Sequence, residues 1–146
     1  IEIPAGYEFA GIDDNKQQVV FTKIQIEYPK TYEECCKVLN LTKYPPALVP
    51  NKSMFISQYE DFPHYYEIQK FAQLLVCRDA YWKIAGDWKY DVNKTEEYFY
   101  IINKCGRIVK EHYMNFNHIL AFPTSEMRDA FKENFDDDIE ICKEFL

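Results

Sequence analysis

Hydrophobic side chains recur every three or four residues in two long stretches of the chain, and this spacing predicts two amphipathic helices. The first helix begins at Pro63 and ends near Ala85, where Gly86 can adopt the left-handed conformation that closes a helix. Apolar residues cover so wide an arc of this helix that we expect it at the centre of its domain. The second helix follows Thr124, whose hydroxyl can cap it. Its apolar face consists of Met127, Ala130, Phe131, Phe135, Ile139, Cys142 and Phe145.

Alternation of apolar and polar residues predicts β-strands in two other parts of the chain. Residues 1–26 have the pattern of a β-hairpin, and residues 11–16 contain the Gly, Asp and Asn that favour its turn. Because two strands alone are marginally stable in water, we expect this hairpin to lie on another part of the protein. Residues 98–102, 107–114 and 119–122 predict a three-strand meander.

A short helix and an irregular loop are predicted between the hairpin and the first long helix. Thr31 and Glu34 have the spacing of a capping box, in which each side chain accepts from the other's backbone N–H, so residues 31–40 predict a helix. The prolines within residues 41–62 exclude a helix there, and the apolar residues among them favour a loop wrapped over the body.

These elements together predict a single α+β domain over residues 1–146. We expect a small antiparallel sheet, made of the three-strand meander and the N-terminal hairpin, to pack against two long helices and one short helix. Residues 63–146 would form a helix–meander–helix core, to which the preceding elements are appended.

Composition and charge narrow the possible functions of this domain. The chain has 146 residues, of which 47% are hydrophobic and 17% aromatic, so it can bury a substantial core. No apolar run is long enough to span a membrane. The net charge of −7 disfavours general nucleic-acid binding, which needs a basic surface. The chain starts at Ile1 without a signal-peptide pattern, and we interpret this start as a processing or expression boundary.

Titratable side chains follow no recognised catalytic or metal-binding pattern. The five cysteines include the adjacent Cys35 and Cys36, which are poorly placed to bridge each other, so we interpret all five as reduced, partly buried thiols of a cytosolic protein. His112 and His118 lack the spacing of a metal or acid–base site. The three consecutive aspartates at 136–138 would diverge around a helix as a solvated face. We therefore predict no catalytic residue, no cofactor and no metal ligand.

The best candidate binding surface lies where the first long helix ends, in a segment that also contains Tyr81. Its residues are Arg78, Trp82, Trp88, Lys89 and Tyr90. One interpretation makes the tryptophans core residues, with Arg78 paired to a carboxylate of the last helix. The other makes the group an interface anchor or a platform on which bases stack, with Arg78 as an anion contact. We expect a buried Trp82, a partly buried Trp88 and an exposed Tyr90.

Four segments carry a resemblance to a known group of proteins. They are IPAGYE at 3–8, PKTYEE at 29–34, the stretch from RDAYW at 78–82 to GDW at 86–88, and AFPTSEMRDAF at 121–131. The sequence resembles uncharacterised proteins encoded by phages and mobile elements of gut Bacteroidales. This resemblance implies a setting in the bacterial cytoplasm or a virion, and it carries no activity or catalytic residue.

The function expected from the sequence is therefore interaction without catalysis. We expect a phage or mobile-element protein that binds a protein partner or self-associates, as a virion or assembly component or as an inhibitor of a host system. The alternative is a nucleotide or single-stranded nucleic-acid binding module that uses the aromatic residues. No membrane association is expected.

Overall fold

The fold is known from a computed structural model that describes residues 2–4, 6–41, 65–91, 93, 94, 96–114 and 118–146. The predicted loop at 41–62 lies outside these residues except for Leu41, as does the predicted helix start at Pro63. The described elements are β1 (Tyr7–Asp13), β2 (Gln18–Lys23), α1 (Tyr32–Val38), α3 (Tyr65–Ile84), β3 (Glu97–Lys104), β4 (Arg107–Met114), β5 (Leu120–Phe122), α4 (Ser125–Asn134), α5 (Asp136–Ile141) and the 3₁₀ helix η1 (Lys143–Phe145).

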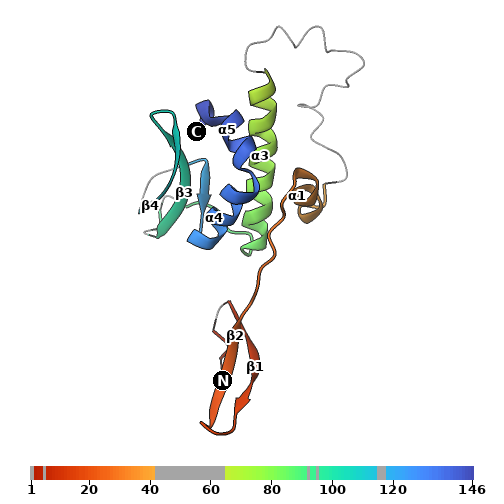
Figure 1. Ribbon diagram of the computed structural model, residues 1–146, viewed down its shortest axis with the longest axis vertical. Coiled ribbons are helices and arrows are strands. Elements are labelled where there is room, and N and C mark those ends of the chain that lie inside the picture. Colours follow the sequence, from red (N-terminus) through yellow and green to blue (C-terminus); the bar gives the residue numbers. More distant parts are fainter. Residues whose placement is uncertain (1, 5, 42–64, 92, 95, 115–117) are drawn as a thin grey trace.

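The α+β class is confirmed, with helices packed on a small antiparallel sheet (Figure 1). The helices α4 and α5 pack against α3 on the side of the three-stranded sheet, α3 also contacts β5, and α1 packs on the other side of α3 (Figure 1). These elements, together with Tyr28 and Pro29, are called the body below. Its buried core draws on α1, α3, β3, β5, α4 and α5.

The three strands do not form the simple meander that we predicted. Their order is β4-β3-β5, so β5 pairs with β3, with Tyr100 opposite Ala121. The central place of β3 agrees with its side chains, which are buried on both faces of the sheet. Tyr98 and Tyr100 lie on one face and Ile101 on the other. The strand β4 is an edge strand and carries the charged residues Arg107, Lys110 and Glu111.

The last predicted helix is broken in two at Phe135. This residue is buried but has φ −124° and ψ 24°, which ends α4 and precedes α5. The three aspartates that we assigned to a solvated face lie in the first turn of α5, where negative charge is favourable to the helix dipole. The apolar face itself is correct, because Met127, Phe131 and Ile139 are buried.

Tyr81 organises the centre of the core. Its ring stacks on Tyr28 with 5.0 Å between centroids and meets Phe131 edge-on at 5.0 Å. Its hydroxyl donates to the Pro29 carbonyl oxygen (2.8 Å) and accepts from the Asn134 side-chain amide (3.0 Å). Burial raises the pKa of this hydroxyl. Tyr81 is therefore a core residue that fixes the incoming chain at 28–29, and it is not part of an aromatic surface.

The N-terminal hairpin forms where predicted, but its expected packing on the body is wrong. The strands β1 and β2 make a separate two-stranded sheet, which projects from the body at the end of an extended segment (Figure 1). An ion pair of Lys23 with Glu126 (3.7 Å) joins the hairpin to the body. Both of these side chains are exposed, so the pair contributes little stability.

Candidate functional site

The predicted aromatic residues gather where α3 ends. The chain turns back through Gly86 (φ 78°) and Asp87 (φ 57°), and the Trp88 backbone N–H donates to the Trp82 carbonyl oxygen at 3.0 Å. This turn places the two indole rings edge to face, with 5.3 Å between centroids. The role predicted for Gly86 as the helix stop is confirmed.

A cavity of about 340 Å³ opens beside the two tryptophans. It is lined by Leu39, Arg78, Asp79, Trp82, Lys83, Asp87, Trp88 and Lys89. Four of the five predicted residues therefore come together in one place, with three basic and two acidic side chains around the indoles. The volume lies within the range of small-ligand sites.

Tyr90 does not share this cavity, and its predicted exposure is wrong. The residue is half-buried, and its ring packs on Tyr98 at 4.7 Å between centroids. Its hydroxyl oxygen is buried and has no hydrogen-bond partner among the described residues. The chain after Trp88 runs along the sheet rather than outward, because Tyr98 offers an aromatic surface that removes the Tyr90 ring from water.

Arg78, Asp79 and the Trp82 indole N–H are bonded within the protein. The Arg78 guanidinium lies 4.2 Å from the Trp82 ring centre, donates to the Ile119 carbonyl oxygen (3.0 Å) and pairs with Asp79 (2.8 Å). The predicted partner of Arg78 on the last helix is thus wrong. Trp82, which we expected to be buried, is half-buried, and its indole N–H donates to the Ala121 carbonyl oxygen (2.7 Å). These bonds connect α3 to the sheet, and one face of Trp82 is already covered by Arg78.

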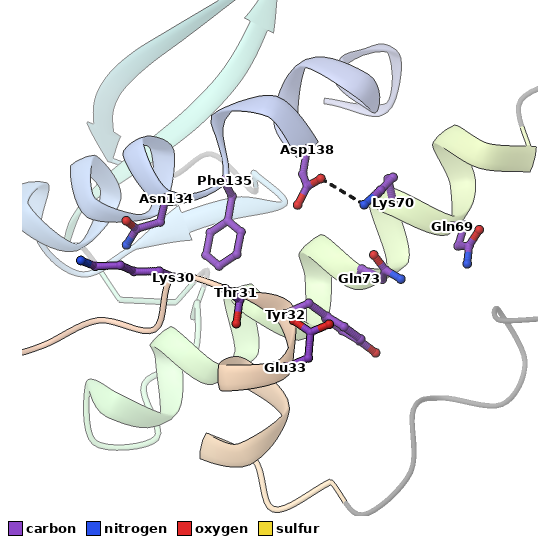
Figure 2. Close-up of a pocket in the computed structure, with 10 residues that line it drawn as sticks. All are labelled: Lys30, Thr31, Tyr32, Glu33, Gln69, Lys70, Gln73, Asn134, Phe135 and Asp138. Carbon is purple, nitrogen blue, oxygen red and sulfur yellow. Dashed lines mark ion pairs between the residues drawn. The ribbon is translucent and has the colours of Figure 1, made fainter.

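A second, more polar cavity of about 460 Å³ lies between the start of α1, the first half of α3 and the junction of α4 with α5 (Figure 2). It is lined by Lys30, Thr31, Tyr32, Glu33, Gln69, Lys70, Gln73, Asn134, Phe135 and Asp138. An ion pair of Lys70 with Asp138 (3.4 Å) crosses one end (Figure 2). Sequence reasoning missed this cavity, because three segments far apart in the chain build it.

Among the described residues, the histidines and cysteines form no group with the arrangement of a reactive site. His112 pairs with Glu97, and His118 stacks on Tyr100 with 3.8 Å between centroids. Burial lowers the pKa of His118. Four cysteines are buried and Cys105 is exposed, and all five are free thiols. Across the described ranges, His, Cys, Asp and Glu residues form no group of three that could hold a metal ion.

A third surface lies on the hairpin, which the sequence predicted but did not indicate as a binding site. Directly opposed residues share a face of a two-stranded sheet, and the register opposes Tyr7 to Lys23, Phe9 to Phe21 and Ile12 to Val19. One face therefore carries five apolar side chains, which we call the apolar hairpin face. Its members are Tyr7, Phe9, Ile12, Val19 and Phe21.

A β-bulge creates this face. Phe9 and Ile12 are three residues apart and would point to opposite sides of a regular strand. The register shifts between Phe9 and Gly11, and the extra residue returns Ile12 to the side of Phe9. Gly11 (φ 144°) belongs to the bulge, although we had assigned it to the turn. The turn is built further on, where the Asp13 carboxylate accepts from the Asn15 and Lys16 backbone N–H groups.

The apolar hairpin face is open to solvent. Tyr7, Phe9 and Ile12 expose 42%, 56% and 64% of their surface, and Val19 and Phe21 are partly covered by their cross-strand neighbours. Large apolar side chains gathered on one exposed face are typical of an interaction site. The bulge that joins them was visible in the sequence only as a glycine between Phe9 and Ile12.

The chain matches no known protein family, no curated protein and no solved structure. No helix among the described residues is long and apolar enough to cross a lipid bilayer.

Proposed function

We propose that this protein is a non-enzymatic interaction protein that binds a protein partner, or a second copy of itself, through the apolar hairpin face. The supporting observation is the β-bulge at Phe9–Gly11, which places Ile12 on the same face as Phe9 although no described part of the body covers that face. A bulge that gathers apolar side chains into water lowers stability unless another surface covers them.

The architecture of the hairpin supports the same proposal. A two-stranded sheet is marginally stable alone, so it gains order when another molecule covers one face. The chain that follows the hairpin is held firmly to the body. Tyr28 stacks on Tyr81, and the Pro29 carbonyl oxygen accepts from the Tyr81 hydroxyl. The hairpin is thereby presented to a partner by a rigid support and is not needed to complete the core.

A nucleotide or single-stranded nucleic-acid ligand is the second candidate, and the tryptophan cavity is the observation that favours it. Lys83 and Lys89 line this cavity and form no ion pair among the described residues, so they could meet a phosphate. Arg78 covers one face of Trp82, however, which leaves less indole surface for a base. Quenching of tryptophan fluorescence by a mononucleotide, weakened by salt and by Lys89→Gln, would establish this alternative.

The setting of the protein is part of the proposal. The resemblance of segments 3–8, 29–34, 78–88 and 121–131 supports an origin in a phage or mobile element, with a place in the bacterial cytoplasm or a virion. In that setting the hairpin would contact another virion subunit, an assembly factor or a host protein that this chain inhibits.

Site-specific photo-cross-linking tests the proposal. A photoreactive phenylalanine analogue at position 9 would report on the apolar hairpin face, and the same analogue at position 8, on the opposite face, is the matched control. We expect a cross-linked product in the producing cell from position 9 and much less from position 8. Equal products from both positions, or none from either, would contradict the proposal.

A further inference from the structure

We infer that the occupant of the apolar hairpin face is a second copy of this chain, with the two hairpins packed face to face and antiparallel about a two-fold axis. This inference rests on the proposed function and names its partner. It is carried by the order of the side chains along the face and by the charges at its two ends.

The face is complementary to itself. Three cross-strand pairs follow one another from base to tip: Tyr7 with Lys23, Phe9 with Phe21, and Ile12 with Val19. No ionisable group lies on the face between Lys23 and the tip, so two such faces can meet without burying an unpaired charge. In a two-fold interface each copy supplies the same patch, which is the commonest form of protein self-association.

The charges at the two ends select the antiparallel arrangement. Lys23 lies at the base of the face, whereas Asp14 lies in the turn at the tip, which also contains Lys16. Asp13 pairs with Gln18 and therefore belongs to the opposite face of the hairpin. An antiparallel pair brings each tip near the other copy's base, so that Asp14 and Lys23 meet twice by symmetry. A parallel pair would bring the two Asp14 carboxylates together at the tips and the two Lys23 side chains together at the bases, and like charges repel.

Lys23 is available for this exchange. Its ion pair with Glu126 is 3.7 Å long and exposed at both partners, and such pairs are worth little in water. Asp14 is exposed and forms no ion pair among the described residues, whereas Asp13 holds the turn. The net charge of −7 opposes association of the copies, so the apolar contacts must supply the affinity and the charges the orientation.

The size of the surface sets the strength of the association. Three half-exposed large side chains offer roughly 300 Å² per copy, because each such residue buries about 150 to 250 Å² when fully covered. Two copies therefore bury about 600 to 800 Å² with Val19 and Phe21 included, below the roughly 1,200 Å² of a stable interface. We expect a dimer that forms reversibly and depends on concentration.

Sedimentation equilibrium of the full chain over a roughly hundredfold range of concentration measures this association. We expect a monomer–dimer equilibrium in the wild type, weakened at least about tenfold by Phe9→Thr. Val20→Thr is the matched control, because Val20 is exposed on the opposite face and threonine keeps the strand propensity in both variants. A wild type that is monomeric throughout, or equal effects of the two variants, would overturn the inference.

Charge exchange tests the orientation. Lys23→Glu and Asp14→Lys should each weaken the dimer. The double variant should restore it, because the two side chains have exchanged their charges and again attract each other between the copies. Glu126→Gln should leave the dimer unchanged and controls for the loss of the internal ion pair. If the double variant loses as much dimerisation free energy as the two single variants added together, the antiparallel arrangement is overturned.

The two proposals fail in different ways. A monomeric wild type with position-9 cross-links to another protein would overturn self-association and leave the interaction function supported. A monomeric wild type without cross-links that favour position 9 over position 8 would overturn both.

Discussion

Phe131 in the body and Phe9 in the hairpin are the same residue type in opposite surroundings. Phe131 is fully buried among Tyr81, Phe122 and Phe135, whereas Phe9 exposes 56% of its surface. Both belong to regular apolar patterns in the sequence. The pattern specifies which side chains share a face, and the surface that covers the face depends on the rest of the molecule or on another molecule. The body supplies its own cover, and the hairpin requires a cover from elsewhere.

The largest expected effect lies in the core of the body. Phe131→Ala should lower the free energy of unfolding by about 3 to 5 kcal/mol, because it removes a fully buried ring and leaves a cavity. Urea denaturation followed by tryptophan fluorescence measures this change. Phe9→Ala, at a concentration where the chain is monomeric, is the control and should have a much smaller effect. Similar losses from the two variants would mean that the hairpin is part of the core.

A smaller effect is expected at the joint between the two regions. Tyr81→Phe removes a buried hydroxyl that donates to the Pro29 carbonyl oxygen and accepts from Asn134. The carbonyl of buried Pro29 and the side-chain amide of half-buried Asn134 lose this partner, and the cost should be about 1 to 3 kcal/mol. Tyr66→Phe, at an exposed position, should be neutral in the same denaturation experiment. A neutral Tyr81→Phe would show that water replaces both bonds.

The pH dependence of stability should distinguish the two regions. Burial lowers the pKa of His118 below its ordinary value of about 6.5, so the unfolded chain binds a proton that the folded protein binds less readily. The free energy of unfolding should therefore fall as the pH decreases from about 7 to about 5.5. His118→Phe keeps the ring beside Tyr100 and should make this fall shallower.

Self-association should respond differently, because the segment from Gly6 to Ile26 contains no histidine. Sedimentation equilibrium at the same pH values should show an unchanged dimer as long as the body remains folded. A dimer that dissociates within this range would place an ionisable group of the body in the interface.

The sequence predicted features that depend on nearby residues. The Thr31 and Thr124 hydroxyls accept from the Glu34 and Met127 backbone N–H groups, and both helix starts are confirmed. The capping box is only half formed, because the Glu34 carboxylate accepts from the Lys30 N–H instead of that of Thr31. A capping side chain reaches only a few backbone groups, so its hydrogen-bond partner can be predicted from the spacing of residues along the chain.

Features that depend on distant residues were not predictable in the same way. The strand β5 pairs with β3 and not with β4, because the buried residues of β3 need neighbours on both edges. Tyr90 is covered by Tyr98, a contact that spacing along the chain does not reveal. The candidate site was predicted for four of five residues because α3 and its glycine turn hold them together locally. The hairpin was predicted, but its exposed apolar face was not, because we expected another part of the protein to cover it.

The smallest effect on the body is expected from removing the hairpin itself. Deletion of residues 1–26 takes away the exposed Lys23–Glu126 ion pair but keeps Tyr28 and Pro29, so the free energy of unfolding should change by less than about 1 kcal/mol. Deletion of residues 1–29 is the matched control. It also removes the ring stacked on Tyr81 and the acceptor of the Tyr81 hydroxyl, and it should cost about 2 to 4 kcal/mol. Both measurements use dilute protein, so that self-association does not contribute to stability. Equal costs for the two deletions would show that the hairpin stabilises the body as much as its anchor does, and would remove the contrast between a covered and an uncovered apolar face.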